Sequence, residues 1–411
     1  MQMGAQEIFA VLVILSIAPF GFSYHNVFNV LNFGAVGDGK RDDTEAFKKA
    51  WAAACSVRRY STLLIPRGKT FLVNSYTFTG KCKASRIFFM LQGNLVAPPR
   101  GRISNVKSWI TFYSVDSLTI TGSGHLDGQG YSWWPKECFV KPEGCQYIGY
   151  ERPTLLSFEG CNMLNVNNVR LINSPRNHIT VDGCNQVSFS GISISAPEKS
   201  PNTDGINIGN SGFIKITNVN IASGDDCLSF LPGTNNVNVS HITCNPGHGI
   251  SIGSIYIGKV EKVFVEHCTL SNTQNGVRIK TKQGGSGYVR DIHFNDIQMY
   301  SVSNPIIIDQ YYFSPINLIL HDLGPFVFPS KTGLKTSAVE ISNVEFSSIR
   351  GTTQGDLAIK LACSQTVPCK DIRLNDVKLR SVVPHKHVYS YCLSIHGPRC
   401  PNCSPQVPCL G

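Results

Sequence analysis

Six polar residues in the middle of the chain could do chemistry if the fold brought them together. They are three acids, one imidazole and two cations: Asp204, Asp225, Asp226, His248, Arg278 and Lys280. Carboxylates at close range repel one another, which raises their pKa values and costs stability. Acids clustered beside bases are therefore typical of a metal site or of acid catalysis. Either role requires elements that hold residues distant in sequence side by side.

A five-residue pattern that recurs six times in this region indicates those elements. It reads polar, small, apolar, any, apolar, and its copies are NHITV at Asn177, DGINI at Asp204, DCLSF at Asp226, HGISI at His248, NGVRI at Asn275 and NPIII at Asn304. Their starts are 27, 22, 22, 27 and 29 residues apart, the length of one coil of a parallel β-helix. Short segments rich in Val, Ile, Thr and Asn fill about residues 85–350, and long helical periodicity is almost absent. We therefore predict an all-β fold, a parallel β-helix in which each copy is one rung.

Sheet geometry turns this repeat into a site. Neighbouring parallel strands lie about 4.8 Å apart, so the leading residues of successive copies stack in a column. Asp204, Asp226 and His248 then become neighbours, and Arg278 and Lys280 share an outward face of the next rung. The apolar positions stack inward, and they include Ile206, Leu228, Ile250, Val277 and Ile306.

The N-terminal region predicts two separate features. An apolar run from Ile8 to Ile17, followed by small residues, is typical of a cleaved signal peptide, so we assign residues 1–23 to it and residues 24–411 to one β-helix catalytic domain. Asp42 and Glu45 then form a capping box, and apolar residues follow at helical spacing. We expect a short helix there that covers the open end of the stack.

Charge and composition narrow the partners. The net charge of +10 favours polyanions, namely nucleic acid, anionic lipid or an acidic polysaccharide. No run of five basic residues occurs, aromatics are not interleaved with basic residues, and a secreted route argues against nucleic acid. The N-terminal apolar run is too short to span a bilayer. We expect a monomer that binds an acidic polysaccharide, with no membrane anchor, no metal and no cofactor.

The cysteines and two sequons fit an extracellular protein. Fifteen cysteines favour an oxidising compartment, and an odd number leaves one unpaired or intermolecular. The cluster Cys392, Cys400, Cys403 and Cys409 contains a C-x-x-C, but without a second such motif we expect disulfides rather than zinc. Asn238-Val-Ser and Asn402-Cys-Ser are acceptor sequences for glycosylation.

Glycoside hydrolysis suits the predicted cluster. It needs one protonated carboxyl group that assists the leaving group and one ionised group that activates water or attacks the sugar. Mutual repulsion among three aspartates would keep one proton in the cluster near the working pH. Arg278 and Lys280 could bind the carboxylates of a uronic acid substrate.

Four motifs resemble one enzyme family. They are NTDG at residues 202–205, SGDDC at 223–227, GHGISIGS at 247–254 and NGVRIKT at 275–281. In this order and spacing the chain resembles the plant polygalacturonases of glycoside hydrolase family 28, with weaker likeness from about Val27 to the C-terminus. The resemblance implies a single-stranded right-handed parallel β-helix that hydrolyses α-1,4-linked galacturonan with inversion. For inversion, the carboxyl groups are expected about 6.5 to 9.5 Å apart.

The same resemblance implies roles for individual residues. Asp225 is the implied general acid, Asp204 and Asp226 hold and activate the water, and His248 supports protonation of the acid. Arg278 and Lys280 are the implied ligands of galacturonate carboxylates.

Two further matches to the family lie beside these residues. Tyr312 matches the family's active-site tyrosine, and Cys227 and Cys244 match a disulfide. The segment from Ser314 to Lys335 departs from the family's pattern.

Several alternatives stay open at this point. A pectate or rhamnogalacturonan lyase would use the carboxylates to hold calcium. A hydrolase of rhamnogalacturonan or xylogalacturonan, an exo-acting rather than endo-acting enzyme, and a non-catalytic pectin-binding protein of the cell wall are the others. Trp133 and Trp134 either face sugar rings or pack inside a glycine-rich turn, and His178 either packs or contacts substrate at a distance.

Overall fold

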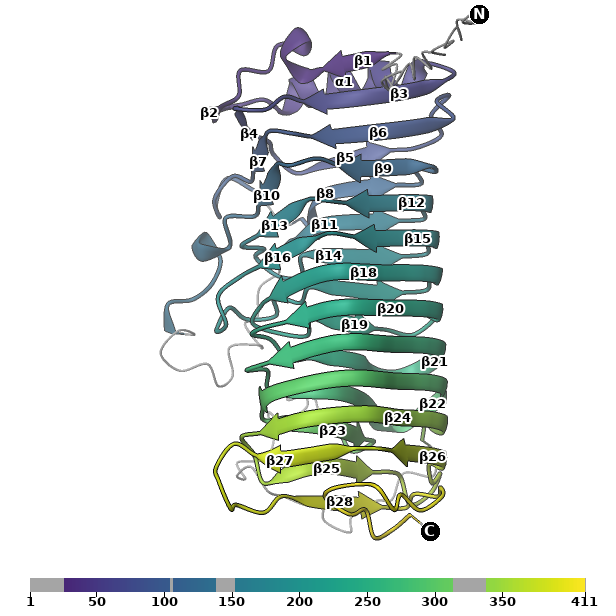
Figure 1. Cartoon of the computed structure of the whole chain (residues 1–411). Helices are drawn as coiled ribbons and strands as arrows, with labels where there is room; N and C mark the ends of the chain where they lie inside the picture. The colour runs from purple at the N-terminus through teal and green to yellow at the C-terminus, as the bar shows by residue number, and fades with distance from the viewer. Residues whose placement is uncertain (1–25, 104–105, 138–151, 313–337, 411) are drawn as a thin grey trace, which may run out of the picture.

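The chain folds into one solenoid of parallel strands, seen in a computed structural model that describes residues 26–103, 106–137, 152–312 and 338–410. The chain winds from β1 at the top of the view to β28 at the bottom (Figure 1). Every strand pairing between successive coils is parallel, which confirms the predicted right-handed parallel β-helix. The predicted signal peptide lies outside the described residues.

The strands form three ladders that run the length of the solenoid. Ladder 1 contains β1 (Val27–Asn29), β3 (Tyr60–Ile65), β6 (Arg86–Leu91), β9 (Leu118–Thr121), β12 (Asn162–Asn167), β15 (Asn185–Ser190), β18 (Gly212–Ala222), β20 (Asn235–Cys244), the second halves of β21 (Ile250–Ser271) and β22 (Asn275–Val302), β24 (Glu340–Thr353) and β26 (Lys370–Asn375). Ladder 2 contains β2 (Asp38–Asp42), β4 (Thr70–Leu72), β7 (Asn94–Val96), β10 (His125–Asp127), β13 (Arg170–Ile172), β16 (Ser193–Ser195), the ends of β18, β20, β21, β22 and β24, and β27 (Lys378–Ser381). Ladder 3 contains β5 (Tyr76–Thr79), β8 (Ser108–Tyr113), β11 (Thr154–Glu159), β14 (Ile179–Asp182), β17 (Ile206–Gly209), β19 (Leu228–Phe230), the first parts of β21 and β22, β23 (Asn304–Asp309), β25 (Leu357–Ala362) and β28 (Tyr389–Leu393).

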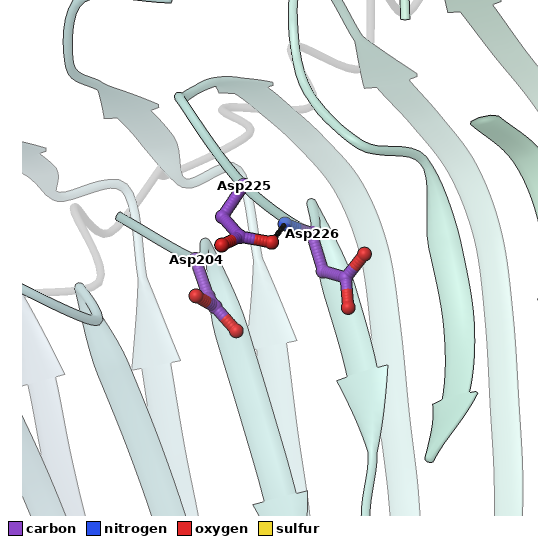
Figure 2. Close-up of side chains that lie close together, drawn as sticks. All are labelled: Asp204, Asp225 and Asp226. Atoms are coloured by element: carbon purple, nitrogen blue, oxygen red, sulfur yellow. Dashed lines mark hydrogen bonds between the residues drawn. The ribbon is translucent and has the colours of Figure 1, made fainter. Parts of the chain in front are cut away.

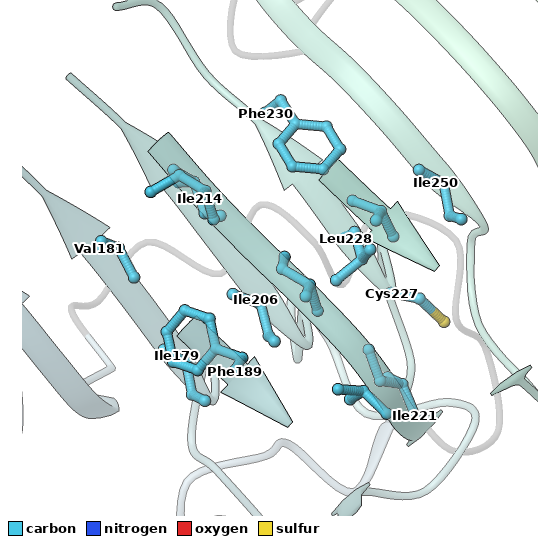
Figure 3. Packing of buried hydrophobic residues seen from close by; sticks show 14 of the residues in the cluster. Ile179, Val181, Phe189, Ile206, Ile214, Ile221, Cys227, Leu228, Phe230 and Ile250 are labelled. Atoms are coloured by element: carbon cyan, nitrogen blue, oxygen red, sulfur yellow. The ribbon is translucent and has the colours of Figure 1, made fainter. Parts of the chain in front are cut away.

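The five-residue repeat predicts the register of ladder 3 correctly. Its first apolar position forms one column of directly paired residues, Ile179, Ile206, Leu228, Ile250, Val277 and Ile306, and Ile359 of the next coil continues the column. These side chains are buried inside the coil, where Figure 3 shows several of them packed together. Because side chains alternate along a strand, the residues between them face outward.

The predicted N-terminal helix is present as α1 (Thr44–Ser56), and it covers the first coils beside β1 and β3 (Figure 1). Its buried residues include Ala46, Phe47 and Trp51. The predicted capping box is wrong in detail, because the N-cap is Asp43 rather than Asp42. Asp43 accepts hydrogen bonds from the N–H groups of Val36 (2.7 Å) and Gly37 (3.0 Å), which ties the preceding turn to the helix start.

Two short 3-10 helices complete the described elements, η1 (Val30–Phe33) and η2 (Gly130–Ser132). Within the described ranges, no helix has the length and apolar character needed to span a membrane.

The cysteines are mostly paired, as predicted. The described residues contain five disulfides: Cys55–Cys82, Cys227–Cys244, Cys363–Cys369, Cys392–Cys409 and Cys400–Cys403. Cys227–Cys244 confirms the pairing that the resemblance implies, and the two C-terminal bridges confirm that the C-terminal cluster forms disulfides. In the described part of the chain three buried cysteines are free, Cys161, Cys184 and Cys268.

Replacement of Leu228 by alanine tests the inward column. Leu228 is fully buried between Ile206 and Ile250. We expect L228A to lower the free energy of unfolding by about 3 kcal/mol, because a leucine removed from a packed core leaves a cavity. Denaturant titration measures the change. V383A is the control, because Val383 is 51% exposed and its truncation should cost little; equal losses in both variants would contradict the register.

Candidate active site

The sequence-predicted residues come together on the outward side of ladder 3. Asp204 lies two residues before β17, Asp226 two residues before β19, and His248 two residues before β21. Backbone hydrogen bonds hold these strand starts side by side: Gly205 N–H donates to the carbonyl of Asp226 (2.9 Å), and Cys227 N–H donates to that of Gly249 (2.8 Å). The predicted column is therefore present.

The three carboxylates form one cluster, which Figure 2 shows at the starts of two neighbouring strands. One oxygen from each of Asp204, Asp225 and Asp226 lies within 4.8 Å of the others. The three carboxyl groups thus share one site on two adjacent coils. The 6.5 to 9.5 Å separation expected for inversion refers to whole carboxyl groups on either side of the bond, and it stays a prediction.

Asp226 is the best-paired acid of the cluster. Arg278 Nη2 lies 2.7 Å from its Oδ1, and Lys280 Nζ lies 2.8 Å from its Oδ2. The hydroxyl of Ser251 donates to Oδ1 (2.9 Å) and accepts from Arg278 Nε (3.1 Å). Asp226 is only 2% exposed, so two cations and a hydroxyl group compensate a charge that is almost entirely removed from water.

Asp225 is held by a different set of groups. His248 Nδ1 lies 3.1 Å from its Oδ1, and the amide of Asn202 donates to its Oδ2 (3.2 Å). The backbone N–H of Asp226 also donates to Oδ1 (2.9 Å), the contact drawn in Figure 2. Burial opposes ionisation, but the hydrogen bond and charge of His248, with the charge of Lys280, outweigh it and hold the pKa of Asp225 well below its ordinary value.

Asp204 has the opposite tendency. Burial, followed by repulsion from Asp225 and Asp226, raises the pKa of Asp204 well above its ordinary value. The amide of Asn207 donates to its Oδ2 (2.9 Å) and opposes the rise only in part. In the ligand-free protein Asp204 therefore retains a proton more readily than Asp225.

The two cations keep capacity for a further anion. Arg278 Nη1 makes no hydrogen bond to a described residue, and Lys280 Nζ carries three donors of which Asp226 takes one. Tyr312 stands next to this pair, with its ring centroid 5.4 Å from Lys280 Nζ. The side chains predicted to bind substrate thus lie beside the acids.

The contacts of the carboxylate oxygens decide how well the cluster could bind a metal ion such as calcium. Calcium takes six to eight oxygen ligands, mostly carboxylates and carbonyls. Here both oxygens of Asp226 are already ion-paired to Arg278 and Lys280, and those two cations would repel a third one. The arrangement therefore suits proton transfer better than metal binding.

Sequence reasoning missed some contributors to the site. Asn202 and Ser251 lie inside recognised motifs but were given no role. Ser251 could have been found, because it is the outward residue paired in register with Arg278. Asn177 begins the first copy of the repeat, and the sequence gives no reason to place it in the site. In the amide orientation that satisfies its neighbours, it donates to Asp204 Oδ1 (3.3 Å) and accepts from Asn207 (3.1 Å).

Burial decides the roles of the tryptophans and the histidine that the sequence left open. Trp133 and Trp134 are 6% and 4% exposed, so they pack inside the glycine-rich turn. His178 is fully buried, and its ring nitrogens face the carbonyl oxygens of Asp204 (3.0 Å) and Ser195 (3.4 Å). Burial lowers the pKa of His178 to about 4. The segment from Ser314 to Lys335 lies outside the described residues.

Comparison with known proteins agrees with this geometry. The sequence model of the family described as glycosyl hydrolases family 28 matches residues 55–400. Polygalacturonase-2 of Solanum lycopersicum is 40% identical over 361 residues, covering 86% of this chain and 75% of that protein. A polygalacturonase of Malus domestica is 40% identical over 358 residues, covering 86% and 74%.

Solved structures share the fold. An endo-xylogalacturonan hydrolase from Aspergillus tubingensis superposes with a TM-score of 0.74 at 24% identity, covering 91% of this chain and 98% of that one. An exopolygalacturonase from Thermotoga maritima gives 0.69 at 20% identity, covering 90% and 91%.

Neutral replacement of Asp204 and Asp225 should change stability in opposite directions near neutral pH. A raised folded-state pKa means that ionised Asp204 destabilises the fold, so D204N is expected to raise the unfolding midpoint. A lowered pKa means that ionised Asp225 stabilises it, so D225N should lower the midpoint.

The pH dependence of the two effects differs. The advantage of D204N shrinks as pH falls through the raised pKa and is lost below about 3.9, the ordinary aspartate value. The penalty of D225N persists below that value until Asp225 itself is protonated. Thermal unfolding across this pH range measures both, with E340Q on exposed Glu340 as the control. Shifts of the same sign near neutrality would contradict the assigned pKa directions.

Proposed function

Because the chain belongs to glycosyl hydrolases family 28, we propose that it is a polygalacturonase that hydrolyses the α-1,4-galacturonosidic linkages of pectin with inversion. The observation that carries the proposal is the cluster of three carboxylates beside two cations in one outward site. Acids supply proton transfer and water activation, while cations next to them match a substrate that bears one carboxylate on each sugar.

The proposed reaction uses the aspartates in two roles. Asp225 donates a proton to the glycosidic oxygen as the bond to the anomeric carbon breaks. Asp204 and Asp226 hold a water molecule, and one of them takes its proton as the water oxygen attacks the anomeric carbon. Asp226 is suited to remain ionised throughout, because Arg278 and Lys280 compensate its charge.

The proton must reach Asp225 before the bond breaks. In the ligand-free site Asp204 holds a proton more readily than Asp225. A bound uronate adds negative charge and excludes water, and both changes raise carboxyl pKa values. We propose that substrate binding moves a proton from Asp204 to Asp225. One oxygen of each group lies within 4.8 Å of the other, so the two groups titrate as a pair that shares this proton.

Recognition of substrate is assigned to the cationic side of the cluster. Arg278 and Lys280 bind a galacturonate carboxylate with the donors that Asp226 leaves unused. Tyr312 offers its ring next to Lys280. His248, which contacts Asp225 from the next coil, orients the acid.

The place of action follows from the same proposal. The disulfides of the described residues support an oxidising compartment, so we propose an extracellular enzyme that acts on the cell wall. Internal rather than terminal cleavage of the polymer is the mode we propose.

Loss of the general acid is the first test. D225N should lower the rate of reducing-end formation on polygalacturonic acid by roughly 10²–10⁴-fold at mildly acidic pH, the usual contribution of a positioned acid. D116N, on an exposed aspartate outside the cluster, should keep the wild-type rate. Circular dichroism confirms that both variants are folded. An undiminished rate in D225N would remove Asp225 from the acid role.

The products of the wild-type enzyme separate the alternatives. Reducing ends should form without added metal and in the presence of a chelator, with no unsaturated, ultraviolet-absorbing product. Proton NMR of the first product should show the β-anomer, because the proposed reaction inverts the anomeric carbon; the α-anomer would contradict inversion. Long oligomers early in the time course indicate internal cleavage, whereas monomer alone indicates terminal cleavage. Chelator sensitivity with an unsaturated product would identify a lyase.

A further inference from the structure

A second exposed feature lies on ladder 1, on a different face of the coil from the carboxylates. It is a groove of about 340 Å³, lined on its outer surface by Phe264, Glu266, His293, Asn295, Glu345 and Ser347. Phe264 is 41% exposed, and its ring is stacked on that of His293 with centroids 4.8 Å apart and planes 9° apart. The two rings face each other, so their outer edges and the free face of Phe264 form an aromatic platform, and the carboxylate of Glu345 lies 3.4 Å from His293 Nδ1 at its border.

An acceptor asparagine stands next to this platform. Asn238 on β20 is paired in register with Phe264 on β21, so their outward side chains are about one strand spacing apart. Asn238 is exposed, and its amide makes no hydrogen bond to any residue in the described ranges. It begins the sequence Asn238-Val239-Ser240, in which Val239 is buried inside the coil. The amide nitrogen is therefore accessible and points to the solvent side of the platform.

We infer that Asn238 carries an N-linked glycan whose first sugar packs on the stacked rings of Phe264 and His293. In the linkage step the amide nitrogen of Asn238 attacks C1 of the sugar on a lipid-linked oligosaccharide diphosphate. The N–C1 bond forms, the C1–O bond to the lipid diphosphate breaks, and the amide loses one proton to solvent. The apolar face of the sugar then covers the rings, and Glu266 or Glu345 accepts hydrogen bonds from its hydroxyl groups.

The second sequon differs in its setting and provides a control. Asn402 lies inside the short loop closed by the Cys400–Cys403 disulfide, and the middle residue of its sequon is the cross-linked, buried Cys403. The middle residue of the first sequon is part of a regular strand. We assign the glycan to Asn238 and not to Asn402. The N402Q variant tests whether the loss of a sequon by itself disturbs secretion.

The occupancy test uses the full chain expressed in plant cells and collected from the medium, since the inference rests on the proposed secretion. Peptide N-glycosidase should remove carbohydrate mass and leave Asn238 as aspartate in the peptide that contains residue 238. N238Q and S240A should lack this modification, whereas S240T and N402Q should retain it. Unmodified Asn238 in the secreted protein, or a chain retained unglycosylated inside the cell, would overturn the inference.

Activity separates this inference from the proposed function. Asn238 lies on ladder 1, so N238Q should form reducing ends on polygalacturonic acid at the wild-type kcat. An active enzyme with unmodified Asn238 would contradict the glycan and leave the proposed activity standing. An inactive enzyme with a glycan at Asn238 would contradict the proposed activity and leave the glycan standing.

The packing of the sugar is tested by thermal unfolding. Enzymatic removal of the glycan should lower the unfolding midpoint of the wild type, because the platform becomes exposed again. The same treatment should leave the midpoint of F264A nearly unchanged. F213A is the matched control, since Phe213 is 61% exposed on another strand, and it should respond like the wild type. An equal decrease in F264A and the wild type would show that the sugar does not pack on Phe264.

Discussion

Hydrogen bonding between the backbones of successive coils positions every residue of the candidate site. Each outward side chain of ladder 3 is held by a strand that pairs on both sides and packs its inward residues in one column, such as Ile206, Leu228 and Ile250. A slip of one residue would turn the inward column to solvent and the polar residues into the core. The site is therefore as rigid as the core beneath it, although its residues come from four different coils.

That rigidity allows an unfavourable arrangement of charge. Three carboxylates within 4.8 Å would separate in a flexible loop, but here their strands cannot move apart without breaking the ladder. The protein compensates one of them fully, since Asp226 is ion-paired to Arg278 and Lys280. Asp204 and Asp225 then differ because burial and repulsion raise the pKa of Asp204, whereas His248 and Lys280 hold the pKa of Asp225 down. Different contacts thus make two neighbouring aspartates chemically unequal.

The sequence was sufficient to predict the coils but not the side-chain partners. The recurring apolar pairs identify Ile179, Ile206 and Leu228 as one column, because strand spacing is a property of the backbone. The backbone does not determine the side-chain conformation of Arg278. Its pairing with buried Asp226 two coils away therefore cannot be predicted from the spacing of residues in the sequence.

Side-chain packing limits prediction elsewhere in the same way. The burial of Trp133 depends on neighbours that local sequence does not specify. The helix start shifts from Asp42 to Asp43 because a tertiary contact with the turn at Val36 outweighs the local capping motif.

The compensation of Asp226 also limits how the site can evolve and work. Removing either Arg278 or Lys280 would leave a buried carboxylate underpaired, which costs far more than an exposed ion pair contributes. These two residues are therefore required by the fold as well as by the proposed substrate. A uronate that approaches them binds the same two cations through donors that Asp226 leaves unused, and it adds negative charge beside Asp225. Binding of the substrate carboxylate and the protonation of the aspartates are therefore coupled through these shared cations. A neutral sugar in the same position would add no charge and would not change the protonation of the aspartates in this way.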